Sequence, residues 1–115
     1  MRTFKLVLFS MFISSVAFAQ AMHAPINGVT TITAVTSTSR TQLPSLASAA
    51  CSVVAVAANT GAVYVGGYTV TNASGANPGI KLNAGDALNN LSIQNSNWIY
   101  VAADTANDKV SWICN

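Results

Sequence analysis

Few residues in this sequence are able to carry out acid–base or nucleophilic chemistry. There is one histidine, His23, no glutamate, and three aspartates, Asp86, Asp104 and Asp108. A hydrolase triad needs a nucleophile, a base and an orienting acid, and His23 lies near the chain start, where we expect a solvated tail. Paired carboxylates for glycoside cleavage would have to come from aspartates in expected turns, where Asp is a good turn former. The sequence therefore predicts that the protein is not an enzyme and uses no cofactor.

One short segment concentrates oxygen ligands. Asp104, Asn107 and Asp108 lie within five residues of one another, and calcium prefers carboxylate and amide oxygens. The spacing is not that of an EF-hand loop, and no glutamate closes the site. A polar β-turn explains the same residues, so we expect no metal, with these three as the only calcium candidate.

Aromatic side chains provide a second kind of chemistry, because they stack on sugars and anchor protein partners. Trp98 and Tyr100 share one face of an expected strand, and Ile99 and Val101 share the other. If the aliphatic face is buried, the two aromatic residues form an exposed binding patch. We favour burial of the aromatic face, because the chain beyond residue 19 has no Phe and a small domain needs its large residues for the core.

The first residues have the pattern of an export signal. Arg2 and Lys5 precede an apolar run over residues 6–16, and residues 17–19 (Ala-Phe-Ala) fit the small-x-small rule of signal peptidase. We expect residues 1–19 to be a signal peptide, which leaves 115 − 19 = 96 residues. The apolar run is shorter than the roughly 20 residues that cross a bilayer. The sequence therefore predicts a periplasmic or extracellular protein with no stable membrane span after cleavage.

Two cysteines, Cys51 and Cys114, remain in the exported chain. In an oxidising compartment two cysteines indicate one disulfide, and a loop this long contributes roughly 4 kcal/mol by the chain-entropy model. If their strands are antiparallel neighbours, the residues directly opposite each other follow from the cysteine pair. The pairs that result are Val53 with Trp112 and Ala55 with Val110.

The remaining sequence consists of short β-branched runs separated by turn signals about eight to twelve residues apart. Gly66-Gly67 predicts a hairpin turn, and only residues 88–91 allow a helical turn in place of a strand. The pattern predicts an all-β fold, a small antiparallel β-sandwich of jelly-roll or Ig-like type. The expected strands are 29–36, 52–57, 62–65, 68–71, 80–82, 88–93, 98–102 and 110–114.

Composition divides the exported chain into two parts. Residues 20–50 are rich in Thr, Ser and Ala, and we expect an N-terminal arm with a first strand that packs on the domain or reaches a neighbour. Residues 51–115 are expected to form the disulfide-closed β domain.

Charge excludes one class of partner. Beyond residue 19, Arg40, Lys81 and Lys109 balance the three aspartates, so the formal charge of +2 for the whole chain comes from the signal segment. Three basic residues cannot neutralise a phosphate backbone, so we expect no nucleic-acid binding. A near-neutral surface also favours self-association.

Six short motifs follow one another in the second half of the chain: 59–61 (Asn-Thr-Gly), 63–66 (Val-Tyr-Val-Gly), 79–82 (Gly-Ile-Lys-Leu), 84–86 (Ala-Gly-Asp), 99–101 (Ile-Tyr-Val) and 110–112 (Val-Ser-Trp). In this order they resemble a type of short β-rich protein encoded among the structural genes of tailed bacteriophages. The resemblance covers about half of the chain and implies a β-sandwich on the virion surface, as a decoration, fibre or spike element. The signal segment and the cysteine pair depart from that pattern, and leave room for a secreted homologue or a virus that assembles at or beyond the membrane.

Two hypotheses for function follow. The first is a non-catalytic structural surface protein, a virion decoration or fibre-like component that associates with itself or with a capsid, tail or cell-surface partner. The alternative is a secreted β-sandwich binding module that recognises a glycan or a cell surface. A specific surface role would use the Trp98 and Tyr100 face, or the loop over residues 72–79, which contains Asn77.

Overall fold

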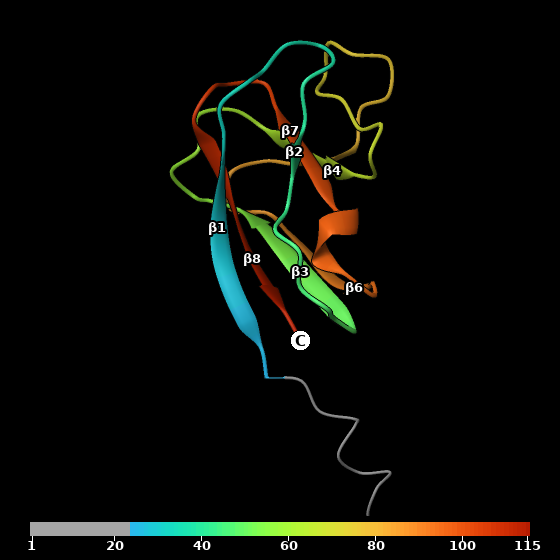
Figure 1. The fold of residues 1–115 in the computed structure, drawn as a ribbon. Helices are drawn as coiled ribbons and strands as arrows, with labels where there is room; N and C mark the ends of the chain where they lie inside the picture. Colours follow the sequence, from blue (N-terminus) through green and yellow to red (C-terminus); the bar gives the residue numbers. More distant parts are fainter. Residues whose placement is uncertain (1–23) are drawn as a thin grey trace, which may run out of the picture.

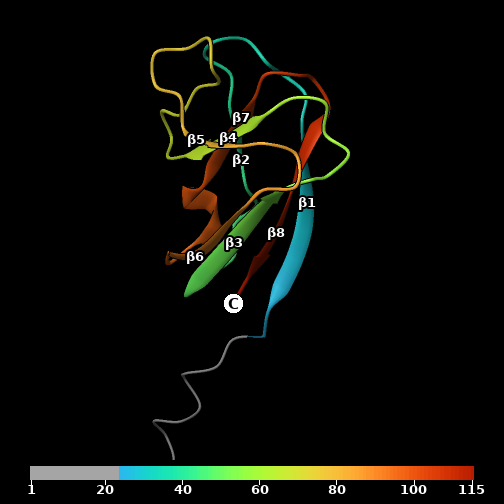
Figure 2. The same cartoon turned by 180° about the vertical axis from the view of Figure 1, so that it is seen from behind.

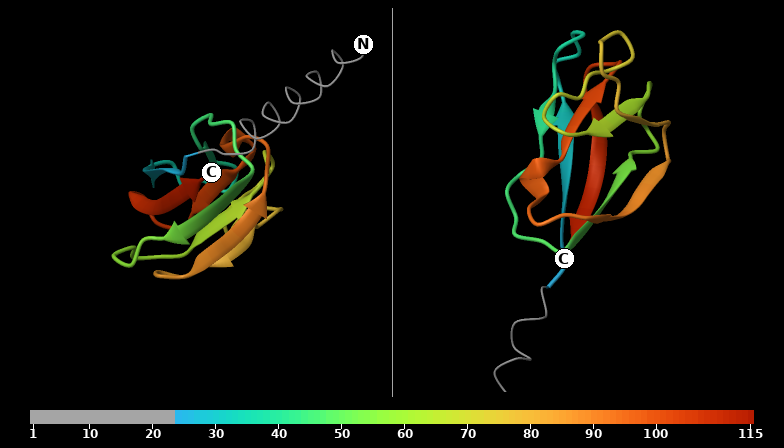
Figure 3. Two further views of the ribbon diagram at one scale, coloured as in Figure 1. Left: turned by 90° about the horizontal axis from the view of Figure 1, so that it is seen from below. Right: turned by 90° about the vertical axis from the view of Figure 1, so that its right-hand side faces the viewer.

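The computed structural model describes residues 24–115. The expected signal peptide and His23 lie outside the described residues. The described part is all-β, with two four-stranded antiparallel sheets packed face to face (Figure 1; Figure 3 shows the same layers from below and from the side). The strands are β1 (Ile26–Ile32), β2 (Thr41–Gln42), β3 (Ala50–Ala55), β4 (Val63–Gly66), β5 (Ile80–Leu82), β6 (Ala87–Ser92), β7 (Tyr100–Ala103) and β8 (Asp108–Cys114), and the 3-10 turn η3 (Ser96–Trp98) precedes β7.

Strand order identifies the sandwich as a jelly roll. The first sheet has the order β1-β8-β3-β6 and the second β2-β7-β4-β5. The antiparallel pairs β1–β8, β2–β7, β3–β6 and β4–β5 are all present. The first strand thus pairs with the last, the second with the last but one, and so on inward. This is the eight-strand jelly-roll arrangement, and it differs from the Ig-like order, in which the last strand joins the sheet of the C and F strands.

Buried and exposed side chains alternate along the strands, and the buried ones form one core between the sheets. In β3 and β8, every second side chain is buried and points toward the second sheet. Branched aliphatic residues dominate the centre because they pack well on a pleated surface. The buried cluster includes Ile32, Leu43, Val53, Val63, Val101, Val110 and Trp112.

The N-terminal segment belongs to the sandwich. β1 pairs with β8 along all seven of its residues, begins before the expected 29–36 strand, and places Ile32 in the core. Gly28 lies opposite Trp112 and leaves room for its indole ring. Residues 26–50 are therefore not a separate arm, and the expected boundary at residue 51 falls inside one packed unit.

The strand expected over residues 88–93 is confirmed as β6, which carries one extra residue opposite Ser52. Asn90 adopts a positive φ of 58° there, in the left-handed region that Asn tolerates better than most residues. The hairpin predicted at Gly66-Gly67 is wrong, because β4 pairs with β5 and β7 and the chain turns over residues 67–69 without a partner strand.

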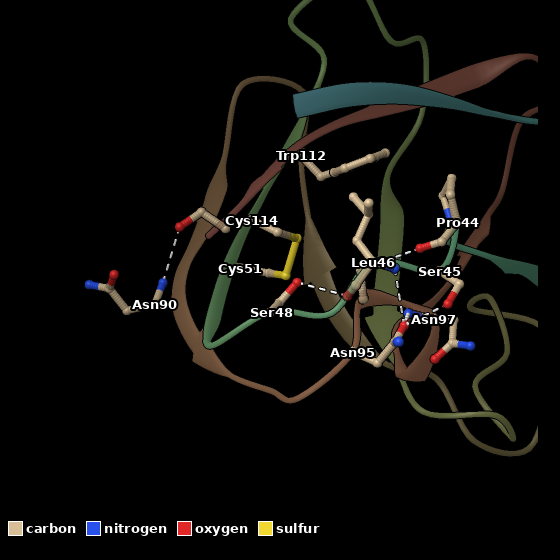
Figure 4. Close-up of a disulfide and its surroundings, with 12 residues drawn as sticks. Pro44, Ser45, Leu46, Ser48, Cys51, Asn90, Asn95, Asn97, Trp112 and Cys114 are labelled. Carbon is tan, nitrogen blue, oxygen red and sulfur yellow. Dashed lines mark hydrogen bonds between the residues drawn. A yellow bond between two sulfur atoms is a disulfide. The ribbon is translucent and has the colours of Figure 1, made fainter. Parts of the chain in front are cut away.

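The disulfide prediction and its register are confirmed. Cys51 and Cys114 are bonded and lie directly opposite each other in β3 and β8, with Cα atoms 4.1 Å apart. Figure 4 shows the sulfur–sulfur bond with Leu46 and Trp112 beside it. The pairs Val53 with Trp112 and Ala55 with Val110 follow in the same register. Within residues 24–115, no helix has the length and apolar character needed to cross a membrane.

Candidate binding groove

The preference for burying the aromatic face at Trp98 and Tyr100 is wrong. Ile99 and Val101 point into the core, whereas Trp98 is 56% exposed and Tyr100 is half-buried. Trp98 also does not lie in a strand, because it ends η3. Branched aliphatic residues and Trp112 fill the core without these two rings.

The two aromatic residues instead line a hollow on the outer face of the second sheet. Its volume is about 340 Å³, which is at the lower end of the range for small-ligand sites, about 300–1,000 Å³. We call this hollow the aromatic groove. Its walls are Gln42, Gly67, Tyr68, Asn97, Trp98 and Tyr100.

Strand register places the floor of the aromatic groove. Tyr100 in β7 lies opposite Gln42 in β2 on one side and opposite Gly66 in β4 on the other. These three residues therefore form one row across the outer face of the sheet. Nε2 of Gln42 donates a hydrogen bond to the backbone oxygen of Asn97 at 2.8 Å, which ties β2 to η3.

A capped turn holds Trp98. Oδ1 of Asn95 accepts from the backbone N–H of Asn97 at 2.9 Å and from that of Leu46 at 3.2 Å (Figure 4). The hydroxyl of Ser96, which is fully buried, donates to the backbone oxygen of Pro44. This network anchors η3 to the chain after β2, so the exposed indole of Trp98 extends from a rigid base.

Arg40 holds the segment that carries Tyr68. Its guanidinium donates to the backbone oxygens of Tyr68 at 2.7 Å and of Val70 at 3.1 Å. These hydrogen bonds hold the segment after β4 in place, while β5 and β7 occupy both sides of β4 and leave no side for a hairpin partner. Asn77, expected as a surface-binding residue, donates through Nδ2 to the backbone oxygen and the hydroxyl of Thr69 at 3.2 and 3.0 Å. Asn77 therefore supports the neighbour of Tyr68 and does not line the aromatic groove.

The groove lining is uncharged. It combines three aromatic rings with two primary amides and one glycine. Among the described residues, Oδ1 of Asn97 is a buried acceptor without a hydrogen-bond partner. An unpaired buried acceptor costs about 1–3 kcal/mol, so this oxygen is a local cost to stability next to the groove.

A second small core lies next to the groove and stiffens its sheet. Val70 packs over Tyr64 and Ala102 on the outer face, and Tyr100 packs against the same cluster. The hydroxyl of Tyr64 donates to Oδ2 of Asp104 at 2.9 Å. Burial, together with the hydrogen bond and the charge of Asp104, raises the pKa of Tyr64 above its usual 10.0.

The calcium candidates have structural hydrogen bonds that point to different parts of the fold. Oδ1 and Oδ2 of Asp108 accept from the backbone N–H groups of Thr60 and Gly61 at 2.9 and 2.8 Å. Asp104 accepts from the Tyr64 hydroxyl and from the backbone of another loop, and Asn107 turns the chain with φ of 71°. Over residues 24–115, no three His, Cys, Asp or Glu side chains gather as a metal site would require.

Sequence reasoning found Trp98 and Tyr100 but missed Tyr68, Gln42 and Asn97. The available signal for Tyr68 was an aromatic residue, a type that often contacts ligands, placed directly after a Gly-Gly pair. Gln42 and Asn97 are 55 residues apart, and nothing in the sequence links them.

The fold is compatible with both functional hypotheses. Jelly-roll sandwiches include viral capsid and lectin domains, so the architecture by itself does not choose a function. No family model, curated protein or solved structure matches this chain.

Proposed function

We propose that the protein is an exported, non-catalytic binding module that holds a neutral carbohydrate in the aromatic groove. The observation that carries this proposal is the gathering of Tyr68, Trp98 and Tyr100 around one hollow that contains no charged side chain. The disulfide supports an oxidising, exported environment.

The chemistry of the lining fits a sugar. The C–H faces of a pyranose ring pack against aromatic rings, and its hydroxyls both donate and accept hydrogen bonds, as the amides of Gln42 and Asn97 also do. An anionic ligand would lack a cationic partner here, since the nearby Arg40 already donates to three backbone oxygens. A neutral glycan therefore matches the groove better than a phosphorylated or carboxylated one.

The rigid base of the groove also suits binding. η3 is capped by Asn95 and the Tyr68 segment is held by Arg40. Ordering loops on binding reduces affinity, and here the loops that present the rings are already hydrogen-bonded to the sheets.

The test is glycan-array binding of the exported full chain, followed by titration of the best neutral glycan. Trp98→Ala removes the largest aromatic ring of the wall, and we expect at least about tenfold weaker binding, which corresponds to about 1.4 kcal/mol. Ile113→Ala is the matched control, since Ile113 is 48% exposed on the other sheet and lies outside the groove. Loss of binding with Trp98→Ala and none with Ile113→Ala supports the proposal. Absence of neutral-glycan binding, or equal affinity of the Trp98 variant, contradicts it.

Assembly on a virion or similar particle is the second candidate function. The observation that favours it is the uncharged strand β1 at an edge of the first sheet. Mass spectrometry of purified particles and of culture supernatant distinguishes the two locations: recovery in particles supports the structural role, and recovery only as free protein contradicts it.

A further inference from the structure

The sandwich has four sheet edges, and three of them have features that block pairing with another strand. Natural proteins protect edges with short strands, bulges, proline and charged side chains. β2 is two residues long and is followed by Leu43 and Pro44. β5 is three residues long and contains Lys81. β6 is interrupted by the bulge at Asn90.

The fourth edge, β1, has none of these features within its seven residues, although Pro25 directly precedes it, and no strand among residues 24–115 pairs with its outer side. It runs for seven residues, Ile-Asn-Gly-Val-Thr-Thr-Ile, with neither a charged residue nor a proline, and it pairs with β8 without a register shift. β1 lies at the outer side of its sheet in both opposite views (Figures 1 and 2). Such a strand is a template for addition of another strand.

The hydrogen bonds of β1 show which backbone groups face outward. The carbonyl of Ile32 accepts from the N–H of Asn107 at 2.8 Å, on the β8 side. Because backbone groups alternate in direction along an antiparallel strand, those of Asn27, Val29 and Thr31 point to the free edge. These three residues present N–H and C=O groups in a row, centred on Val29.

We infer that β1 pairs with β1 of a second copy of this chain, antiparallel and about a two-fold axis at Val29. The axis sets Val29 opposite the partner's Val29, and Asn27 opposite the partner's Thr31. Every outward backbone group then meets a complementary group, as an isologous interface requires. The two four-stranded first sheets become one continuous sheet.

The side chains along β1 agree with this register. Val29 is 59% exposed on the outer face of the sheet, and Ile26 is 49% exposed at the strand end. In the proposed pair, Val29 covers its own counterpart and Ile26 lies opposite the partner's Ile32. Because β1 has no charged residue, like charges do not oppose each other across the two-fold axis. This inference is independent of ligand binding in the aromatic groove.

The experiment is analytical ultracentrifugation of the full chain, with its disulfide formed, over a range of concentrations. We expect a monomer–dimer equilibrium for the wild type. Val29→Lys and Val29→Glu place two like charges directly opposite each other and should each weaken dimerisation by at least about tenfold. An equimolar mixture of the two variants should dimerise again, because Lys then faces Glu.

A matched control separates edge pairing from packing of the sheet face. Ser111→Lys adds the same charge on the same outer face, at the residue opposite Val29 in the inner strand β8, and should leave the dimer intact. Circular dichroism and disulfide formation confirm that each variant is folded. A wild type that stays monomeric overturns the inference, as does equal dissociation by Ser111→Lys or a charge mixture that fails to dimerise. A monomer that still binds glycan would overturn only this edge pairing and not the proposed groove function.

Discussion

Reduction of the disulfide should remove a large part of the folding stability. The bond joins residues 63 positions apart, so breaking it frees a long loop in the unfolded chain. It also lies inside the core, where Cys51 and Cys114 are 1% and 3% exposed. Two thiols need more space than two bonded sulfurs, and their strands have directly opposed Cα atoms only 4.1 Å apart.

The expected loss follows from these observations. The chain-entropy model gives about 4 kcal/mol for a loop of this length. A chain of 115 − 24 + 1 = 92 described residues has an expected stability of about 5–14 kcal/mol at about 0.05–0.15 kcal/mol per residue. Reduction therefore removes between about a third and four-fifths of the free energy of unfolding.

Urea unfolding of oxidised and reduced protein, followed by tryptophan fluorescence, measures this loss as a lower midpoint. The Cys51→Ala/Cys114→Ala variant is the control, because its midpoint should be low and should not respond to reductant. A loss below about 1 kcal/mol on reduction of the wild type would refute the reasoning, since the loop term alone exceeds that value.

Three further changes test other parts of the fold by the free energy of unfolding. Asp108→Ala should cost about 3 kcal/mol, because two backbone N–H groups lose a charged acceptor. Gly28→Ala should cost about 1–2 kcal/mol, because the added methyl group overlaps the Trp112 ring and overpacking outweighs the entropic gain. Tyr64→Phe should abolish an alkaline loss of stability: burial and Asp104 raise the Tyr64 pKa in the folded protein, so this contribution is complete below the unfolded pKa of about 10 and disappears as pH rises through the folded pKa.

Each of these changes has a control or a contradicting outcome. Gly67→Ala introduces the same methyl group where it meets no atom within 4 Å, and should not destabilise the fold. Asp108→Asn keeps one acceptor and should lose less than Asp108→Ala. If the wild type and Tyr64→Phe lose stability equally at alkaline pH, the role given to the buried phenol is wrong.

Local sequence was sufficient to predict the fold class and the pairing of two central strands, β3 and β8. β-Branched runs, turn residues and the two cysteines predicted an all-β sandwich with Cys51 opposite Cys114. The register of β3 against β8 followed because opposed residue numbers in an antiparallel pair keep a constant sum. The expectations at Gly66-Gly67 and Trp98 were wrong because distant groups decided them. β5 and β7 occupy both sides of β4, and Asn95 caps a turn at Trp98.

By itself, the sequence determined the all-β class, the disulfide and the scarcity of ionisable groups, since each depends on residue type or short-range pattern. Only the tertiary structure decided the jelly-roll order and the aromatic groove. The groove needs Gln42, Tyr68 and Trp98 on one outer face, and their meeting depends on winding paired strands into two layers, which is a property of long-range contacts and not of any local segment.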